Sequence, residues 1–159
     1  MRKTVELDDF DRRLIEQVRH NNIEPARTLA DKVGLSPSAV LRRLRRLRKE
    51  KVIIADIAVI DPQLTGTALT IHVVVKMQHS GMQLTDTFSK RIVRHREVTG
   101  AWNVTGDYDF LLKVQVGTME EYDAFTHRAL SEEQGVLNFQ TSITIRTIAD
   151  DVFNRRPLV

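Results

Sequence analysis

The segment SPSAVLRRLRRLRKEK, residues 36–51, decides how the first part of the chain folds. Ser36 suits a helix N-cap because its hydroxyl accepts an unpaired backbone N–H, and Pro37 suits the first helical position because it has no N–H to leave unpaired. At about 100° per residue, the segment places its apolar residues on one face: Val40, Leu44 and Leu47, with Leu41 at the edge. The pattern predicts an amphipathic helix.

The opposite face of this helix is cationic. Seven of the ten residues from Arg42 to Lys51 are Lys or Arg, and only one is Glu. A solvated surface helix usually mixes the two signs, because like charges at i and i+4 repel each other. Here Arg42 repels Arg46, and Arg45 repels Lys49. A polyanion bound along the helix accounts for this pattern better than a solvated charge face does.

The positive charge belongs to the first part of the chain. The whole chain has 159 residues and a net charge of +3, a length that suits one domain or two small ones. Residues 1–63 contain 14 basic and 10 acidic residues, whereas residues 64–159 contain 10 basic and 11 acidic ones. We therefore expect two domains, 1–63 and 64–159, of which the first binds the polyanion.

Composition argues against several kinds of site. The chain has no Cys, and therefore no disulfide, thiolate nucleophile or thiolate metal ligand. Its five His residues show no metal-ligand spacing: His20, His72, His79, His95 and His127. No apolar run reaches the roughly 18 residues of a membrane span, and the first ten residues lack the apolar core of a signal peptide. We expect a cytoplasmic protein without a membrane segment, metal or cofactor.

Two further helices are predicted before the basic one. Residues 7–21, LDDFDRRLIEQVRHN, carry apolar residues at helical spacing, and Asp8 or Asp9 can cap their start. A second short pattern runs from Pro25 to Gly34, and a tight turn joins it to the basic helix. This arrangement is typical of a helix-turn-helix, whose second helix enters the DNA major groove.

The apolar period changes after the basic helix. Residues 52–61, VIIADIAVID, are rich in β-branched side chains and predict a strand that forms either a wing or the link to the next domain. The later segments are predicted as strand, helix, strand, strand, helix and strand, in this order: residues 67–79, 84–95, 98–105, 109–116, 119–130 and 136–148. The expected class is α+β, an N-terminal winged helix-turn-helix followed by a ferredoxin-like βαββαβ domain.

This domain order also predicts self-association. Both helices of a ferredoxin-like domain cover the same face of the sheet, and the first strand alternates over apolar residues: Leu69, Ile71, Val73 and Val75. We expect the other face of the sheet still to carry apolar residues, so that the strand faces with these residues or their alternates exceed what one layer of two helices buries and a second copy of the chain covers the rest.

These motifs together resemble the Lrp/AsnC (leucine-responsive/asparagine-responsive) family of transcription regulators. The motifs that carry the likeness are LADKVGLSPSAVLRRLRRLRKEKVI, DPQLTG and VTGDYDFLLKV, and they span nearly the whole chain. The resemblance implies homodimers that bind double-stranded DNA, assemble further, often to octamers, and sense an amino acid or related metabolite. One position departs from the pattern: Lys51 stands where similar proteins usually have Gly, which relieves a left-handed conformation.

Within the basic helix, base contacts are expected from the N-terminal part and phosphate contacts from its flanks. The base-contact candidates are Ser38, Ala39 and Arg42, and Arg42 can bind guanine in bidentate fashion. The phosphate candidates are Arg27, Thr28, Ser36, Arg43, Arg46 and Lys49.

The second candidate site is the turn TGDYDF, residues 105–110. Gly and Asp are also ordinary hairpin residues, so a purely structural turn is the alternative. An amino acid carries an ammonium and a carboxylate, which carboxylates and backbone N–H groups complement. The resemblance implies an effector site between neighbouring dimers, formed by Asn103, Thr105, Gly106, Asp107, Tyr108 and Asp109 of the turn and by Thr141, Ser142, Ile143 and Thr144 of the last strand. Trp102, the only Trp, could line this site too, but a single Trp in a domain more often lies in the core.

Two other functions remain open. Some proteins that resemble this family are enzymes, the sirohaem decarboxylases, but an enzyme has no need for a capped helix with a continuous cationic face. A second alternative is a structural nucleoid protein without an effector, which would differ from a regulator only in whether the second candidate site binds a ligand. The sequence predicts a regulator rather than an enzyme, and leaves its effector, its operators and the sign of regulation open.

Overall fold

The computed structural model describes residues 5–58, 60–61, 64–78, 82–131 and 135–148. The chain forms two compact units, and among these residues the first covers 5–58 and residue 148 and the second covers 60–147. The boundary expected between residues 63 and 64 comes shortly after this division in the sequence, and residues 62 and 63 lie outside the described part.

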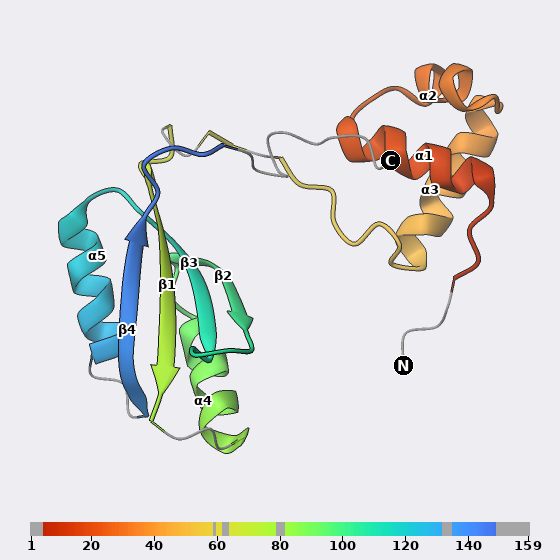
Figure 1. Cartoon of the computed structure of the whole chain (residues 1–159). Helices are drawn as coiled ribbons and strands as arrows, with labels where there is room; N and C mark the ends of the chain where they lie inside the picture. Colours follow the sequence, from red (N-terminus) through yellow and green to blue (C-terminus); the bar gives the residue numbers. More distant parts are fainter. Residues whose placement is uncertain (1–4, 59, 62–63, 79–81, 132–134, 149–159) are drawn as a thin grey trace. The chain divides into compact units, whose positions relative to one another are not determined.

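Three helices make up the first unit: α1 (Asp9–His20), α2 (Ala26–Val33) and α3 (Pro37–Lys49) (Figure 1). Their apolar faces meet in one buried cluster: Leu14, Val18, Leu29, Ala30, Val33, Val40, Leu44 and Leu47. Leu41 is 44% exposed, as expected for the edge of the apolar face. The helix-turn-helix predicted from the periodicity is therefore confirmed, with α2 and α3 as its two members.

Local sequence sets the helix ends. Asp8 caps α1 in a capping box, where the Asp8 side chain accepts the Asp11 N–H and the Asp11 side chain accepts the Asp8 N–H. Ser36 caps α3, since its hydroxyl accepts the Ala39 N–H at 3.3 Å. Gly34 ends α2 with φ of 76°, a left-handed conformation that Gly adopts without strain.

The end of α3 is strained at Lys51. This residue has φ of 55°, and no other described non-glycine residue has a positive φ. Its N–H bonds to the Arg48 carbonyl, and the Val52 N–H bonds to the Leu47 carbonyl at 2.9 Å, which together form a Schellman cap. Lys51 thus adopts the left-handed conformation that glycine relieves.

Replacing Lys51 by Gly is expected to stabilise the first unit by about 1 kcal/mol. A left-handed conformation costs a non-glycine residue roughly 1–2 kcal/mol, and relieving it is partly offset because glycine loses more conformational entropy on folding. Thermal melting monitored by circular dichroism measures the change. Lys51→Ala is the matched control, since it removes the same charge but keeps the strain. Equal melting temperatures of Lys51→Gly and wild type would contradict this prediction.

The strand predicted for residues 52–61 is wrong for the described residues of that range, which form no strand. A β-branched run becomes a strand only when a partner strand completes its hydrogen bonds, and no described strand pairs with it. The wing expected next to the helix-turn-helix is therefore absent from the described part of the chain.

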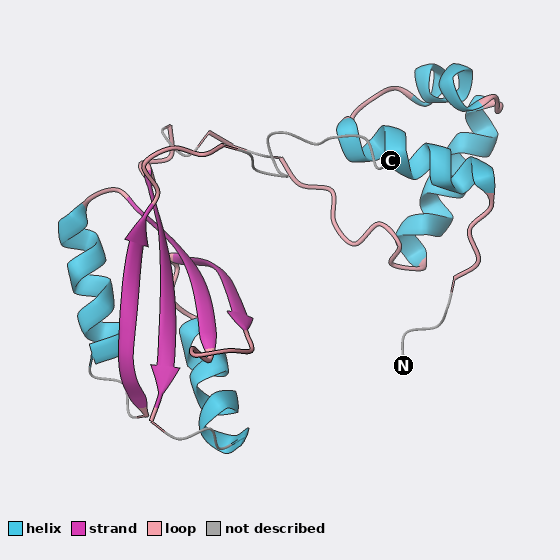
Figure 2. Ribbon diagram, in the orientation of Figure 1, coloured by secondary structure: helices cyan, strands magenta, loops and turns pink. Residues whose placement is uncertain are grey.

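The second unit is a four-stranded antiparallel sheet with helices on one face (Figure 2). Its elements follow the predicted βαββαβ order: β1 (Leu69–Met77), α4 (Met82–Ile92), β2 (Val98–Asn103), β3 (Phe110–Val116), α5 (Met119–Thr126), continued by one π-helical turn (His127–Ser131), and β4 (Val136–Ile143). The strand order is β2-β3-β1-β4, so β1 and β3 are central and β2 and β4 are edges. The last strand ends at Ile143, whereas the sequence predicted residues 136–148.

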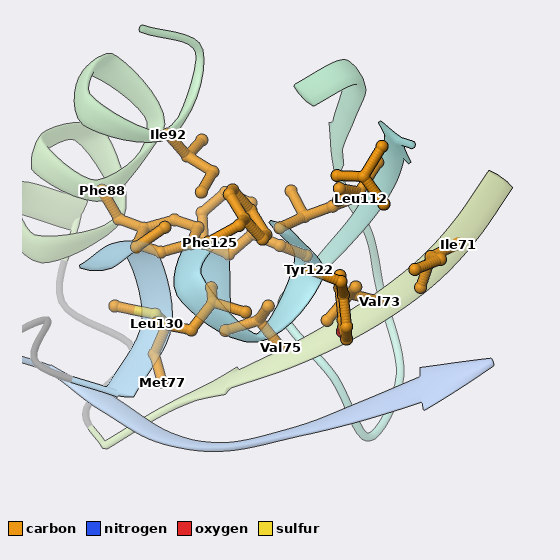
Figure 3. Close-up of a cluster of buried hydrophobic side chains, with 14 residues drawn as sticks. Ile71, Val73, Val75, Met77, Phe88, Ile92, Leu112, Tyr122, Phe125 and Leu130 are labelled. Atoms are coloured by element: carbon orange, nitrogen blue, oxygen red, sulfur yellow. The ribbon is translucent and has the colours of Figure 1, made fainter. Parts of the chain in front are cut away.

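Alternate residues of β1 and β3 face the helices and form the core (Figure 3). Ile71, Val73 and Val75 are fully buried beneath Phe88, Phe125 and other side chains of the helix layer. The helix layer therefore covers Ile71, Val73 and Val75, and the apolar surface expected to need a partner can lie only outside this row.

The other face of the sheet is mixed rather than apolar. It carries His72, Val74 and Lys76 from β1, and their cross-strand partners include Leu111 and Lys113 of β3. Trp102 lies opposite Leu111 and is 50% exposed, so the expectation of a core Trp is wrong. No described helix is long and apolar enough to cross a membrane.

Candidate DNA-binding and effector sites

One side of α3 presents cations to solvent. Ser38, Arg42, Arg45 and Lys49 are all exposed, and their spacing of four, three and four residues places them in one stripe along the helix. Arg42, Arg45 and Lys49 form no ion pair within the described part of the chain. We call these four residues the α3 stripe.

The other flank of α3 is neutralised by carboxylates of α1. Arg43 Nη1 lies 2.7 Å from Asp8 Oδ2 and 2.8 Å from Asp11 Oδ1, and Arg46 Nη2 pairs with Asp11 Oδ2. Asp11 is only 1% exposed. Burial alone raises the pKa of the Asp11 carboxyl, but the hydrogen bonds from Arg46 and Arg43 outweigh it, so the pKa lies below its ordinary value.

A third cation of α3 holds the segment that follows the helix. Arg48 donates two hydrogen bonds to the Asp56 carboxylate, from Nε at 2.8 Å and from Nη2 at 3.0 Å. These bonds lower the pKa of the Asp56 carboxyl. Asn22 also donates to Asp56, at 3.4 Å. Arg48 therefore has a structural partner, although it belongs to the same run of charges as the α3 stripe.

The remaining candidates for DNA contacts lie in the first turns of α2 and α3. Arg27 and Thr28 are exposed in the first turn of α2, and Ala39 is half-buried in the first turn of α3. The structure adds two residues that the sequence analysis did not name as candidates, Arg45 and Asp11. Arg45 lies in the stripe, and its position three residues after Arg42 could have indicated this. Asp11 binds two arginines, and no local signal indicates that.

The turn between β2 and β3 has an ordered base and an open tip. Asp109 forms the base: its N–H bonds to the Val75 carbonyl at 2.9 Å, and its carboxylate accepts the Met77 N–H at 2.8 Å. Asn103 Nδ2 donates to the Asp109 carbonyl at 2.9 Å. Lys76 Nζ lies 3.7 Å from the same carboxylate. Asp109 therefore holds the hairpin against β1.

The tip consists of Thr105, Gly106, Asp107 and Tyr108. The first three are exposed, and none of the four forms a hydrogen bond or ion pair with the described chain. Gly106 has φ of 118°, which a residue with a side chain adopts only with strain. The tip thus offers one unpaired carboxylate, that of Asp107, beside open backbone N–H groups.

The candidates of the last strand lie far from this turn. Thr141 pairs with Val73 and Ile143 with Ile71, whereas Asp109 lies beside Val75 and Met77, so at about 3.3 Å per residue these strand residues lie roughly 7–20 Å from the turn along β1. Figure 1 shows the β2–β3 turn and the end of β4 at opposite ends of the sheet. One chain does not bring the two groups together.

Two contacts fix the last-strand group in place. The Tyr122 hydroxyl lies 2.5 Å from Thr141 Oγ1, and the Thr144 N–H bonds to the Thr70 carbonyl at 2.9 Å. Burial raises the pKa of the Tyr122 hydroxyl, which therefore stays protonated at neutral pH. Ser142 lies on the outer face of the sheet, opposite His72.

Comparisons with known proteins agree with both halves of this description. An AsnC-type helix-turn-helix domain matches residues 7–48, and an Lrp/AsnC ligand binding domain matches residues 70–152. An HTH-type transcriptional regulator of Sinorhizobium fredii, y4tD, is 40% identical over 141 residues, which cover 89% of this chain and 83% of that protein. The DNA-binding transcriptional activator DecR of Escherichia coli is 31% identical over 142 residues, which cover 89% and 93%.

A solved structure supports the same conclusion. The AsnC family transcriptional regulator from Agrobacterium tumefaciens is 26% identical and superimposes with a TM-score of 0.85 over 91% of this chain and 94% of that chain. The relatives are transcription regulators, so the enzyme alternative is set aside. The chain belongs to the Lrp/AsnC family, and it is a DNA-binding transcription regulator with a ligand-binding domain.

Proposed function

We propose that the α3 stripe is the surface with which this regulator reads double-stranded DNA, in response to an amino acid or related metabolite. The supporting observation is that the second helix of the helix-turn-helix exposes Arg42, Arg45 and Lys49 in line, without ion-pair partners in the described chain. Like charges held in line cost free energy until an anion neutralises them, and the DNA backbone presents anions in a row.

Within the stripe, position along the helix assigns the roles. Ser38 and Arg42 are near the N-terminus of α3, the part that reaches base edges, together with Ala39. Arg45 and Lys49 lie further along and contact phosphates, as do Ser36, Arg27 and Thr28 beside the helix starts. DNA binding requires the compartment that holds the chromosome, and we propose a cytoplasmic location.

The test is equilibrium binding of the full chain to the DNA upstream of its own gene and to a mixed-sequence duplex of equal length, across a range of salt concentrations. We expect affinity for both duplexes to fall steeply with salt, because several phosphates are neutralised, and the upstream DNA to bind more tightly. Salt-independent binding, or equal affinity for the two duplexes, would contradict the proposal.

The proposed effector site combines the open tip of the β2–β3 turn with the end of β4 from another copy. The Asp107 carboxylate suits the ammonium of an amino acid, and the backbone N–H groups beside Gly106 suit its carboxylate. Thr141, Ser142, Ile143 and Thr144 would contribute from the second copy, because in one chain β4 ends at the opposite end of the sheet from the turn, with Ile143 roughly 13–20 Å along the strand from it.

This proposal predicts different results for two neighbouring carboxylates. After a thermal-shift screen identifies an amino acid that stabilises the protein, Asp107→Asn is expected to weaken its binding at least tenfold and leave the melting temperature nearly unchanged. Asp109→Asn is the matched control: it is expected to lower the melting temperature, because its carboxylate bonds to the Met77 N–H. Calorimetric titration measures the affinities, and unchanged affinity in Asp107→Asn would move the site elsewhere.

We further propose that the chain forms homodimers that assemble to octamers. The support is apolar surface that two helices do not cover: Trp102 with Val74 and Leu111 on the outer face of the sheet, and Leu137, Ile143 and Ile145 at the β4 edge. An edge strand with exposed Leu and Ile invites pairing with another chain. Light scattering of the full chain at micromolar concentration measures the assembly, and a monomer would exclude it.

A further inference from the structure

Asp11 connects α1 to the cationic helix through two arginines. It is 1% exposed, and both of its carboxylate oxygens receive an arginine of α3, Arg43 on Oδ1 and Arg46 on Oδ2. Asp8 binds Arg43 from the other side, at 2.7 Å. Two cations of the basic run are therefore directed toward α1 and away from the α3 stripe.

The carboxylates that hold these arginines are themselves fixed. The Asp11 side chain accepts the Asp8 N–H at 3.2 Å, and the Asp8 side chain accepts the Asp11 N–H at 2.8 Å, within the capping box of α1. Both acids are in the first turn or cap of α1, where the helix dipole favours negative charge. The Arg43 guanidinium also lies 5.6 Å above the Phe10 ring. The arginines thus bind to a preformed group.

We propose that Asp11 is a positioning residue for DNA binding: it holds Arg43 and Arg46 against α1, which fixes the rotation of α3 and leaves the cations of the α3 stripe to meet the DNA. This inference rests on the proposed function of α3. It assigns Arg43 and Arg46 a role inside the protein, in place of the phosphate contacts that their charge alone predicts.

A phosphate competes poorly for these two arginines. Moving either of them to DNA would leave the buried Asp11 carboxylate with one partner fewer, and a buried charge without its partner is strongly unfavourable. Among the described residues, the cations of the stripe have no such partner to lose. DNA is therefore expected to bind the stripe and leave the pairs with Asp11 intact.

The salt dependence of DNA binding tests this division. With a mixed-sequence duplex, Lys49→Gln is expected to flatten the negative slope of log K against log salt by about 0.9, the value for one phosphate. Arg46→Gln is expected to leave the slope unchanged. All measurements are made below the melting temperature of each variant. If the slope flattens by the same amount in Arg46→Gln as in Lys49→Gln, the inference is overturned.

Removing the carboxylate should release the two arginines. Asp11→Asn is expected to steepen the slope by about one to two and to reduce the ratio of specific to non-specific affinity, because Arg43 and Arg46 then become available to phosphates. Adding Arg43→Gln and Arg46→Gln to Asp11→Asn should restore the wild-type slope. Simple loss of structure would weaken binding without steepening the slope, and that outcome also overturns the inference.

Asp9→Asn is the matched control. Asp9 is exposed in the same turn of α1 and has no ion pair in the described chain, so its replacement changes the net charge equally without releasing an arginine. An equal change of slope in Asp9→Asn and Asp11→Asn would count against the positioning role. Failure of the proposed function has a different signature: Lys49→Gln would then leave the slope unchanged.

Discussion

Replacing Arg42, Arg45 and Lys49 together by Gln is expected to weaken binding to a mixed-sequence DNA duplex on the order of a hundredfold at 0.15 M salt. Arg45 and Lys49 each neutralise about one phosphate, and each phosphate contributes about 0.9 to the salt slope, so the slope should flatten by roughly 1.8, while loss of Arg42 removes contacts to base edges. Fluorescence anisotropy with a labelled duplex across a salt series measures both quantities.

The matched control for this variant lies in the other unit. Lys90, Arg94 and Arg96 are exposed there, and their joint replacement by Gln removes the same charge from the whole chain. We expect the control to keep the wild-type slope, because these residues are not on the helix-turn-helix. If the two triple variants lose affinity equally, net charge rather than the α3 stripe determines DNA binding.

Replacing Asp11 by Ala is expected to lower the free energy of unfolding of the first unit by about 2–3 kcal/mol. Removing one member of a buried ion pair costs roughly 3–5 kcal/mol, and the cost here is smaller because Arg46 remains partly solvated. The Arg46 side chain is 39% exposed and that of Arg43 is 21% exposed, so water compensates part of the loss. Urea unfolding followed by circular dichroism at pH 7 measures the difference.

The sign of the pH dependence follows from the lowered pKa of Asp11. A carboxyl with a lowered pKa in the folded state stabilises the fold above its ordinary value, about 3.9, and loses this effect as pH falls through the folded-state pKa. The difference in the free energy of unfolding between wild type and Asp11→Ala should therefore become smaller below about pH 4. Asp9→Ala is the control, and a difference that stays constant from pH 7 to pH 3 would contradict the role of the ionised carboxylate.

The local features of the helix-turn-helix were predictable from the sequence. Ser36, Gly34 and the Asp8–Asp11 spacing act within a few residues of themselves, so the helix ends follow from local hydrogen bonding. The apolar faces of the helices and strands were predictable as well, because a period of 3.6 residues in a helix or 2 in a strand determines which side chains lie on the same face. The order of elements in the second unit was predictable for the same reason.

Partnerships between distant residues were not predictable in this way. The sequence shows seven cations in one run, but only the fold decides that Arg43 and Arg46 meet acids more than thirty positions earlier while Arg42 and Arg45 meet none in the described chain. The strand predicted for residues 52–61 is wrong in the described part of that range for the same reason, because a strand depends on a distant partner.

The sequence by itself determined the kind of protein: two units, a capped cationic helix in a helix-turn-helix, and a βαββαβ domain whose hairpin carries TGDYDF. Only the tertiary structure decided which cations are available to DNA, which of the two turn carboxylates is unpaired, and that the two halves of the proposed effector site lie apart in one chain. Periodicity and caps act along the chain over one or two turns, whereas charge pairing and burial depend on which segments meet in space.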